Sequence, residues 1–136
     1  MYNTITNIQS WKSSTDPSSG NFRIISLPRD SPEFFIVDVD KPYWRSGPWN
    51  GYQFLGLPGL YFEAASGLNV DDHNSTVELS YDPYDQKFLE RYVVTYEGIM
   101  VYREWNESEN DWHLYWKSVN SECDVYGKCG GFAVCN

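Results

Sequence analysis

The chain has 136 residues, of which 41% are hydrophobic and 18% aromatic, and its formal net charge is −9 at pH 7. This length fits one domain, or one domain and the start of a second, and the apolar content excludes a compositionally disordered chain. The excess of carboxylates repels phosphate groups, so we expect no nucleic-acid partner and no attachment to an anionic membrane surface.

The first part of the chain predicts a loop, a hairpin and an irregular stretch. Residues 10–20 are rich in Ser, Pro and Gly and should form an exposed loop. Residues 21–27 and 33–39 are predicted strands, joined into a hairpin by a short loop with two prolines. Residues 43–60 contain four Gly and two Pro among aromatic side chains, which excludes a long helix and favours a compact irregular segment.

A β-meander is predicted from residue 60 to residue 120. Its first strand is expected at 61–66, followed by a polar turn at 69–74. Thr76 to Tyr81 alternates between apolar and polar residues, which is the pattern of a half-buried strand. Residues 82–85 should then turn the chain.

The end of the meander should form a hairpin and a last strand. Residues 88–96 and 99–105 flank Glu97-Gly98, a pair that favours a two-residue turn because Gly tolerates positive φ. Beyond a polar loop, alternation places three apolar side chains on one face of the last strand: Trp112, Leu114 and Trp116. Since no window shows the apolar spacing of an amphipathic helix, the predicted fold class is all-β. We expect an antiparallel meander or lectin-like sheet domain, followed by a short Cys-rich irregular tail.

Two kinds of covalent modification are predicted. N-glycosylation sequons occur at Asn74 and Asn106, and each falls in a predicted turn where an oligosaccharide could be attached. The three cysteines, Cys123, Cys129 and Cys135, are separated by five residues each and lie in a Gly-rich segment. This spacing does not match a zinc ribbon, and an odd cysteine in a secreted protein is either reactive or paired between chains.

Three sequence blocks together resemble one known family. Residues 11–20, WKSSTDPSSG, and residues 42–51, PYWRSGPWNG, look like the two signature blocks of the plant S-locus glycoprotein domain. Residues 123–130, CDVYGKCG, look like the block that opens the EGF-like module after it. The three blocks occur in the family's order and at similar spacing. The resemblance is to secreted S-locus glycoproteins and to the extracellular parts of G-type lectin S-receptor-like serine/threonine kinases.

The resemblance implies a division into three segments. Residues 1–20 would be a linker from an upstream lectin domain that this sequence lacks, and residues 21–121 an S-locus glycoprotein-like β domain. Residues 122–136 would be the truncated start of an EGF-like module. The mannose-binding pattern Q-x-D-x-N-x-V-x-Y does not occur in the sequence. Sugar binding by the lectin part and kinase activity are therefore assigned to no residue of this chain.

The resemblance to an EGF-like start also implies a cysteine pairing. The first and third cysteines would be bridged, Cys123 to Cys135. Cys129 would then lack a partner and could link two chains as a homodimer.

Four residues around the second signature block form a candidate ligand platform: Tyr43, Trp44, Arg45 and Trp49. Aromatic faces stack on sugars and on guanidinium groups, so this cluster could hold a carbohydrate or a peptide. The alternative is that the rings fill the core. Elsewhere the sequence contains no nucleophile elbow, zinc-protease motif or phosphate-binding glycine loop, so we expect no catalytic residue, no metal and no cofactor.

The sequence leaves three functions open. The leading one is a non-catalytic extracellular recognition module of a plant receptor-like kinase or S-locus glycoprotein, in recognition of pollen or in defence. Its partner would be a protein or peptide ligand at the cell surface, or a glycan, with membrane attachment only through missing parts of the parent. The second function is a carbohydrate-binding lectin module. The third is a glycosidase-like enzyme that uses paired carboxylates between Asp71 and Asp111, without a supporting motif.

Overall fold

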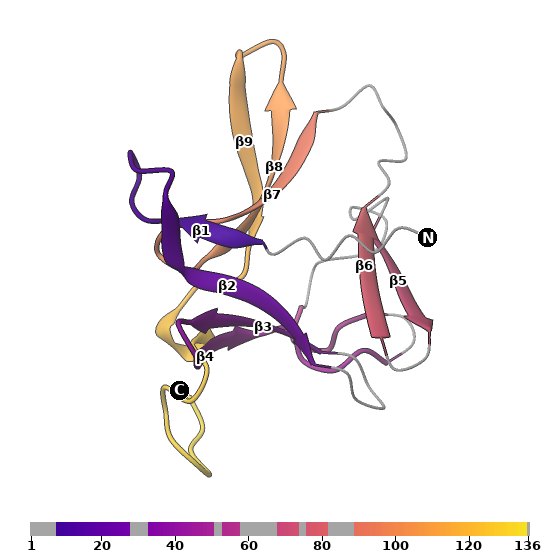
Figure 1. Cartoon of the computed structure of the whole chain (residues 1–136), viewed down its shortest axis with the longest axis vertical. Coiled ribbons are helices and arrows are strands. Elements are labelled where there is room, and N and C mark those ends of the chain that lie inside the picture. The colour runs from indigo at the N-terminus through magenta and orange to yellow at the C-terminus, as the bar shows by residue number, and fades with distance from the viewer. Residues whose placement is uncertain are drawn as a thin grey trace.

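A computed structural model describes residues 8–27, 33–50, 53–57, 68–73, 76–81 and 89–135 of the chain. These ranges form nine strands in three antiparallel sheets and one short 3-10 helix, η1 (Glu122–Asp124) (Figure 1). The strands are β1 (Gln9–Trp11), β2 (Ser19–Leu27), β3 (Glu33–Asp38), β4 (Lys41–Arg45), β5 (Leu68–His73), β6 (Thr76–Tyr81), β7 (Glu90–Val94), β8 (Met100–Asn106) and β9 (Asp111–Lys117).

The three sheets follow chain order, in agreement with a meander. Strands β1 to β4 form a four-stranded sheet, β5 and β6 a two-stranded sheet, and β7 to β9 a three-stranded sheet. In Figure 1 the three-stranded sheet rises above the four-stranded sheet, and the yellow C-terminal segment extends below it. The all-β class predicted from the sequence is confirmed. Within the described ranges, no helix has the length and apolar character of a membrane span.

Strands β2 and β3 form the hairpin that the sequence predicts. Their register pairs Ile24 with Ile36 and continues without interruption for six residue pairs. Aromatic and β-branched side chains favour both strands, because they pack well on a pleated, half-buried surface. The predicted bend before β4 is a tight turn at Val39 and Asp40.

The exposed loop predicted over residues 10–20 is only partly correct. Residues 9–11 form β1, which pairs with β2, and Ser10 is 2% exposed. The Ser10 hydroxyl accepts a hydrogen bond from the Phe22 N–H (3.3 Å). A three-residue strand is too short to show alternation, which explains why the sequence pattern missed it.

The polar turn predicted over residues 69–74 is wrong for residues 69–73. These residues belong to β5, which pairs along its whole length with β6. The pairing is made by backbone groups, so polar side chains do not prevent it. The strand at 76–81 is confirmed. The strand predicted at 61–66 and the turn at 82–85 lie outside the described residues.

The hydrophobic core joins two of the sheets through the loop that follows β4. Its buried side chains are Ile36, Trp44, Phe54, Leu57 and Val94. Partly buried side chains from β8 and β9, Met100 and Trp116, pack against this cluster. Full burial of one large apolar side chain contributes about 1.5–3 kcal/mol. The core therefore fixes one end of the three-stranded sheet against the four-stranded sheet.

The irregular segment after β4 is confirmed where the structure describes it. Ser46 is 1% exposed, and its hydroxyl donates to the Gly47 carbonyl (2.8 Å) and accepts from the Phe34 N–H (3.0 Å). Gly47 has a φ of 68°, which glycine adopts without steric cost. The Gly56 N–H returns to the Ser46 carbonyl (2.8 Å), so the loop closes on itself and places Phe54 in the core.

The predicted β7–β8 hairpin is confirmed, but its turn is one residue longer than predicted. The Gly98 N–H donates to the Thr95 carbonyl (3.0 Å), and the Thr95 N–H donates to the carbonyl of the residue after Gly98 (2.9 Å). A three-residue loop of this kind ends on a left-handed residue, and Gly98 has a φ of 80°. The extra residue shifts the register by one position. Arg91 therefore pairs with Arg103, whereas a two-residue turn would place it opposite Glu104.

Strand β9 carries a bulge at Tyr115. Trp116 pairs with Tyr102, whereas Leu114 already pairs with the next residue along β8, so Tyr115 is the extra residue. An extra residue reverses the face toward which the following side chains point. Trp116 therefore lies on the face opposite to Trp112 and Leu114, and the prediction that the three share one face is wrong.

Candidate binding surface

The strand register separates the charges of the three-stranded sheet by sign. Directly paired residues point to the same face, and neighbours along a strand point to opposite faces. Arg91 pairs with Arg103, so both guanidinium groups lie on one face. Lys117 pairs with the β8 residue that lies two positions before Arg103, so Lys117 lies on the same face. Glu90 pairs with Glu104 on the other face.

The basic side of this sheet is the arginine–tryptophan face. At its centre the Arg91 guanidinium lies over the Trp112 ring, with Cζ 3.9 Å from the ring centroid. The Trp105 ring meets Trp112 edge to face, with centroids 5.5 Å apart. Leu114 is 50% exposed beside them. The face consists of Arg91, Arg103, Trp105, Trp112, Leu114 and Lys117.

No acidic group neutralises this face within the part of the chain that the structure describes. Each carboxylate carried by β7 and β8 points to the other side, and none of the described carboxylates makes an ion pair with Arg91, Arg103 or Lys117. Like charges placed opposite each other on a sheet are unfavourable. Two paired arginines in a chain of net charge −9 therefore form a local site that can attract an anion.

The acidic side of the same sheet holds a stack of tyrosine rings. Tyr92 and Tyr102 stack with centroids 4.8 Å apart, and the Tyr102 hydroxyl donates to Glu104 (2.7 Å). Burial, together with the charges of Glu90 and Glu104, raises the pKa of Tyr92 to about 12. Burial and the Glu104 charge also raise the pKa of Glu90. In the described ranges, no group of three His, Cys, Asp or Glu side chains is placed to hold a metal ion.

The structure separates the residues of the predicted ligand platform. Trp44 is 4% exposed and belongs to the core. Trp49 packs on Phe54 (centroids 4.9 Å apart), and Tyr43 meets Phe22 edge to face (5.1 Å). These three rings pack with the core, as the alternative interpretation holds, and they do not form one exposed surface with Arg45.

Arg45, the fourth platform residue, contacts the C-terminal tail, which we define as Glu122–Cys135. Its guanidinium lies over the Tyr126 ring (5.5 Å to the centroid) and reaches the buried Glu33 carboxylate (3.7 Å). The Tyr126 N–H donates to the Tyr43 carbonyl in β4 (2.7 Å). Arg45 therefore helps to attach the tail to the edge of the four-stranded sheet.

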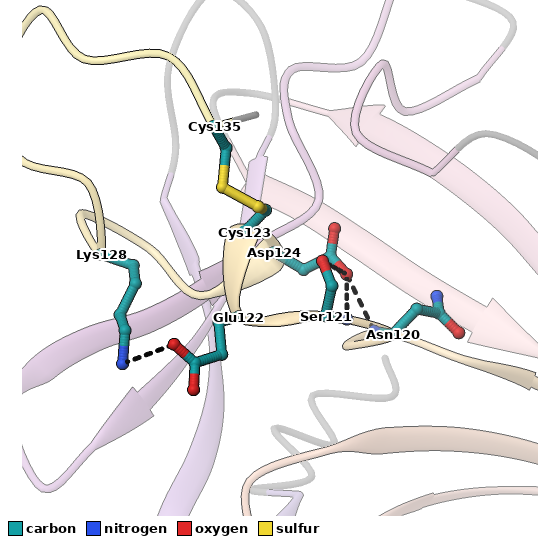
Figure 2. Close-up of a disulfide and its surroundings, with 7 residues drawn as sticks. All are labelled: Asn120, Ser121, Glu122, Cys123, Asp124, Lys128 and Cys135. Atoms are coloured by element: carbon teal, nitrogen blue, oxygen red, sulfur yellow. Dashed lines mark hydrogen bonds and ion pairs between the residues drawn. A yellow bond between two sulfur atoms is a disulfide. The ribbon is translucent and has the colours of Figure 1, made fainter.

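One disulfide, a few polar contacts and an edge-to-face contact of Tyr126 with Phe35 (centroids 6.1 Å apart) hold the tail. Cys123 is bonded to Cys135, with Cα atoms 5.8 Å apart, which is the pair implied by the family resemblance (Figure 2). Cys129 is a free, exposed thiol. Figure 2 also shows an ion pair between Glu122 and Lys128 (3.3 Å). An ion pair between such exposed groups contributes little to stability, so the disulfide is the main constraint on the tail.

Asp124 anchors the start of the tail. Its carboxylate accepts hydrogen bonds from the backbone N–H groups of Asn120 and Ser121, each 2.8 Å long (Figure 2). These two bonds lower the pKa of Asp124. The tail therefore begins at a capped turn with a fixed orientation.

The sequon at Asn106 lies at the end of β8, where the chain enters the exposed loop to β9. The Asn106 side-chain oxygen accepts hydrogen bonds from the Ser108 N–H (3.0 Å) and the Ser108 hydroxyl (2.7 Å). The loop residues 107–110 are exposed. The sequon thus runs from a half-buried asparagine into exposed loop residues, and glycosylation at Asn106 stays a prediction. The other sequon residue, Asn74, lies outside the described residues.

Sequence reasoning missed the arginine–tryptophan face because its residues come from three different strands. Arg91 and Trp112 are far apart in the sequence, and only the register of both hairpins brings them together. The alternation within β8 carried a signal, since Arg103 and Trp105 occupy the same face of that strand. This alternation could not show which β7 residue lies opposite Arg103, because that depends on the length of the loop that contains Gly98.

Comparison with known proteins gives one consistent family. The family model of the S-locus glycoprotein domain matches residues 44–136. A G-type lectin S-receptor-like serine/threonine-protein kinase of Arabidopsis thaliana is 37% identical over 132 residues, which cover 95% of this chain and 15% of the kinase. A second Arabidopsis kinase of the same description is 38% identical over 135 residues, covering 95% of this chain and 16% of that protein. An S-locus-specific glycoprotein of Brassica oleracea is 34% identical over 129 residues, 94% of this chain and 30% of the glycoprotein.

Proposed function

The chain belongs to the S-locus glycoprotein domain family, and from this membership we propose that it is a non-catalytic recognition module of the extracellular part of a plant receptor. Relatives are named as receptor-like serine/threonine kinases and as an S-locus-specific glycoprotein. The chain spans only 15% and 16% of the length of two such kinases. Kinase activity is therefore a property of those proteins and is not assigned to this chain.

One structural observation supports recognition in particular, namely the arginine–tryptophan face. Tryptophan and arginine are the residues that most often dominate the energy of binding surfaces. Here Arg91 is already stacked on Trp112, so its side chain loses less conformational entropy when a partner binds. The face lies on the side of the sheet opposite to Trp116, which packs against the core. Arg91 and Leu114 are exposed on this face, where a partner can contact them.

The proposed location is extracellular or at the plasma membrane. A disulfide such as Cys123–Cys135 persists in oxidising compartments, and a sequon at Asn106 beside an exposed loop fits passage through the secretory pathway. We include glycans at Asn74 and Asn106 in this proposal. Recognition of pollen and defence signalling are the narrower roles within it.

A carbohydrate-binding module is the second candidate function. The exposed part of the arginine–tryptophan face supports it, because aromatic surface with a few polar groups is typical of small-ligand sites. The same face supports both candidates, so a binding experiment on this face tests them together.

The proposed function is tested by binding of the labelled chain to intact plant cells. We expect saturable binding that falls about tenfold or more in the double variant Arg91→Gln/Arg103→Gln, because hydrogen bonds to charged groups are lost. The control variant Lys12→Gln/Arg23→Gln removes the same charge from two exposed ion pairs elsewhere. It should bind like the wild type. Absence of saturable binding, or an equal loss in both variants, would contradict the proposal.

A further inference from the structure

We propose that the arginine–tryptophan face binds an acidic oligosaccharide, with a uronate carboxylate held between two guanidinium groups and the sugar ring against the neighbouring apolar surface. This inference rests on the proposed recognition function and adds the chemical class of the ligand. The residues that would contact it are Arg91, Arg103, Trp105, Trp112 and Leu114.

The charge of the face selects an anion. Directly opposed residues on one face of an antiparallel pair have Cβ atoms about 4.5–5.5 Å apart. From a neighbouring Cβ, the Arg103 side chain can reach a carboxylate bound at the edge of the Arg91 guanidinium, and the planar forks of both match its geometry. No carboxylate of the described residues forms an ion pair with either arginine, so among these residues the ligand displaces no acidic partner.

The net charge of −9 repels an anion at long range but does not prevent it from binding at this face. At physiological ionic strength, exposed charges are screened beyond about 8 Å. Within that distance the arginine–tryptophan face presents Arg91, Arg103 and Lys117. The acidic residues of β7 and β8 are on the opposite side of the sheet. The local field therefore favours binding of a carboxylate at this face.

Stacking fixes Arg91 before the ligand arrives. The guanidinium lies 3.9 Å from the Trp112 ring centroid, which restricts the rotation of a long side chain. A stacked guanidinium still presents the N–H groups at its edge, and these are the groups that bind a carboxylate. Trp105 and the half-exposed Leu114 supply apolar surface beside that edge for the C–H face of a sugar ring. Less entropy is then lost on binding than at a flexible arginine.

The position of the face within the sheet favours a sugar over an acidic peptide. An extended peptide binds best at a free sheet edge or in a groove, where its backbone can form hydrogen bonds. The arginine–tryptophan face is centred on β8, whose backbone is paired on both sides with β7 and β9. A sugar ring needs no backbone ladder, because it offers a flat apolar face and an equatorial carboxylate. The face therefore fits an acidic oligosaccharide.

The test is calorimetric titration of the chain with galacturonate hexamer and with its fully methyl-esterified form. The ester has the same sugar rings without charge, and we expect it to bind about tenfold or more weakly than the free acid. Arg91→Gln should weaken binding of the free acid by a similar factor, and Arg91→Lys should recover only part of it because the planar fork is lost. Binding should also weaken as salt rises from about 0.01 M to about 0.1 M.

Folding is controlled by thermal unfolding of each variant, and Arg103→Gln replaces Arg91→Gln if the latter fails to fold. Lys12→Gln/Arg23→Gln should bind galacturonate like the wild type. Equal binding of the acid and its ester, or unchanged binding by folded Arg91→Gln, would overturn the inference. Tighter binding of a hexaglutamate peptide would also overturn it and would assign the face to an acidic protein.

The two proposals fail in distinguishable ways. If cell binding depends on Arg91 and Arg103 but galacturonate does not bind, the ligand class is wrong and the recognition function stands. If galacturonate binds but intact cells do not bind the chain, the receptor function is wrong and the carbohydrate site stands.

Discussion

The body of the protein, from β1 to β9, and the C-terminal tail achieve their order by different means. In the body, Ile36 is 1% exposed and Trp44 4%, and both belong to one apolar cluster. In the tail no described residue is buried, and the Cys123–Cys135 bond closes the segment. The chain thus uses hydrophobic burial where enough side chains surround a core, and a covalent link where they do not.

Few contacts join the two regions. The Tyr126 N–H donates to β4 at Tyr43, and the Arg45 guanidinium lies over the Tyr126 ring. The Tyr126 ring also meets Phe35 of β3 edge to face (centroids 6.1 Å apart), so loss of the tail would uncover part of this one buried side chain. Because none of its described residues is itself buried, we expect the tail to open without unfolding the body.

The largest effect is expected for Trp44→Ala, which removes a buried tryptophan ring of the core. Truncation of a buried Trp or Phe to Ala costs about 3–5 kcal/mol in the free energy of unfolding. Denaturant unfolding monitored by tryptophan fluorescence measures this loss. Tyr115→Ala, at a 62% exposed side chain, is the control and should change stability by about 0.5 kcal/mol or less. Similar losses in the two variants would mean that Trp44 is not a core residue.

The next effect separates the tail from the body. Cys123→Ser/Cys135→Ser should destabilise the tail by about 2–3 kcal/mol, from loop-closure entropy for a sequence separation of 12. Tryptic cleavage after Lys128 should become faster, while the unfolding transition of the body should stay unchanged. Cys129→Ser should leave both readouts unaltered and should abolish any disulfide-linked dimer on a non-reducing gel. A coupled loss of body stability would show that the regions fold as one unit.

Two glycines allow a matched comparison of body and tail. Gly98 and Gly127 both have positive φ, 80° and 70°, so an alanine at either position costs about 1 kcal/mol in backbone strain. A Cβ on Gly98 would also lie 2.5–2.9 Å from the Phe22 ring, whereas one on Gly127 would meet no atom within 4 Å. Gly98→Ala should therefore cost more, and in the body alone. Equal unfolding free energies for the two variants would contradict this packing at Phe22.

The smallest effect is a pH dependence of opposite sign in the two regions. The pKa of Glu90 is raised above 4.5, so its stabilising contribution is complete below 4.5 and is lost as pH rises through the raised value. The pKa of Asp124 is lowered below 3.8, so its contribution is present above 3.8 and is lost as pH falls through the lowered value. Acidification should thus protect amides of the β7–β8 hairpin and expose those of η1 in hydrogen exchange. Glu90→Gln should remove the first trend only.

The sequence predicted the elements whose patterns are local. Alternation identified the β2–β3 hairpin and β6 because their apolar and polar residues repeat with period two. It missed β1, which has three residues, and it misassigned β5, whose polar side chains resemble those of a turn. In both strands the backbone pairing with a neighbour decides the structure, and a single segment does not show that pairing.

The candidate site could not be predicted because it depends on register. A two-residue turn at Glu97-Gly98 would pair Arg91 with Glu104, a favourable cross-strand contact. The observed three-residue loop instead pairs Arg91 with Arg103 and Glu90 with Glu104, and it therefore concentrates positive charge on one face. A one-residue difference in a loop thus converts a neutral sheet surface into an anion-attracting one.

The bulge at Tyr115 has a consequence for self-association. In the described chain β9 is an edge strand, and four of its seven residues are apolar or aromatic: Trp112, Leu114, Tyr115 and Trp116. A straight strand of this composition would offer its free N–H and C=O groups as a template for fibrillar aggregation. The bulge bends and twists this edge, so a regular strand from another molecule cannot match its hydrogen-bond spacing. The aromatic sheet can therefore remain accessible to a ligand while the edge resists the addition of further copies.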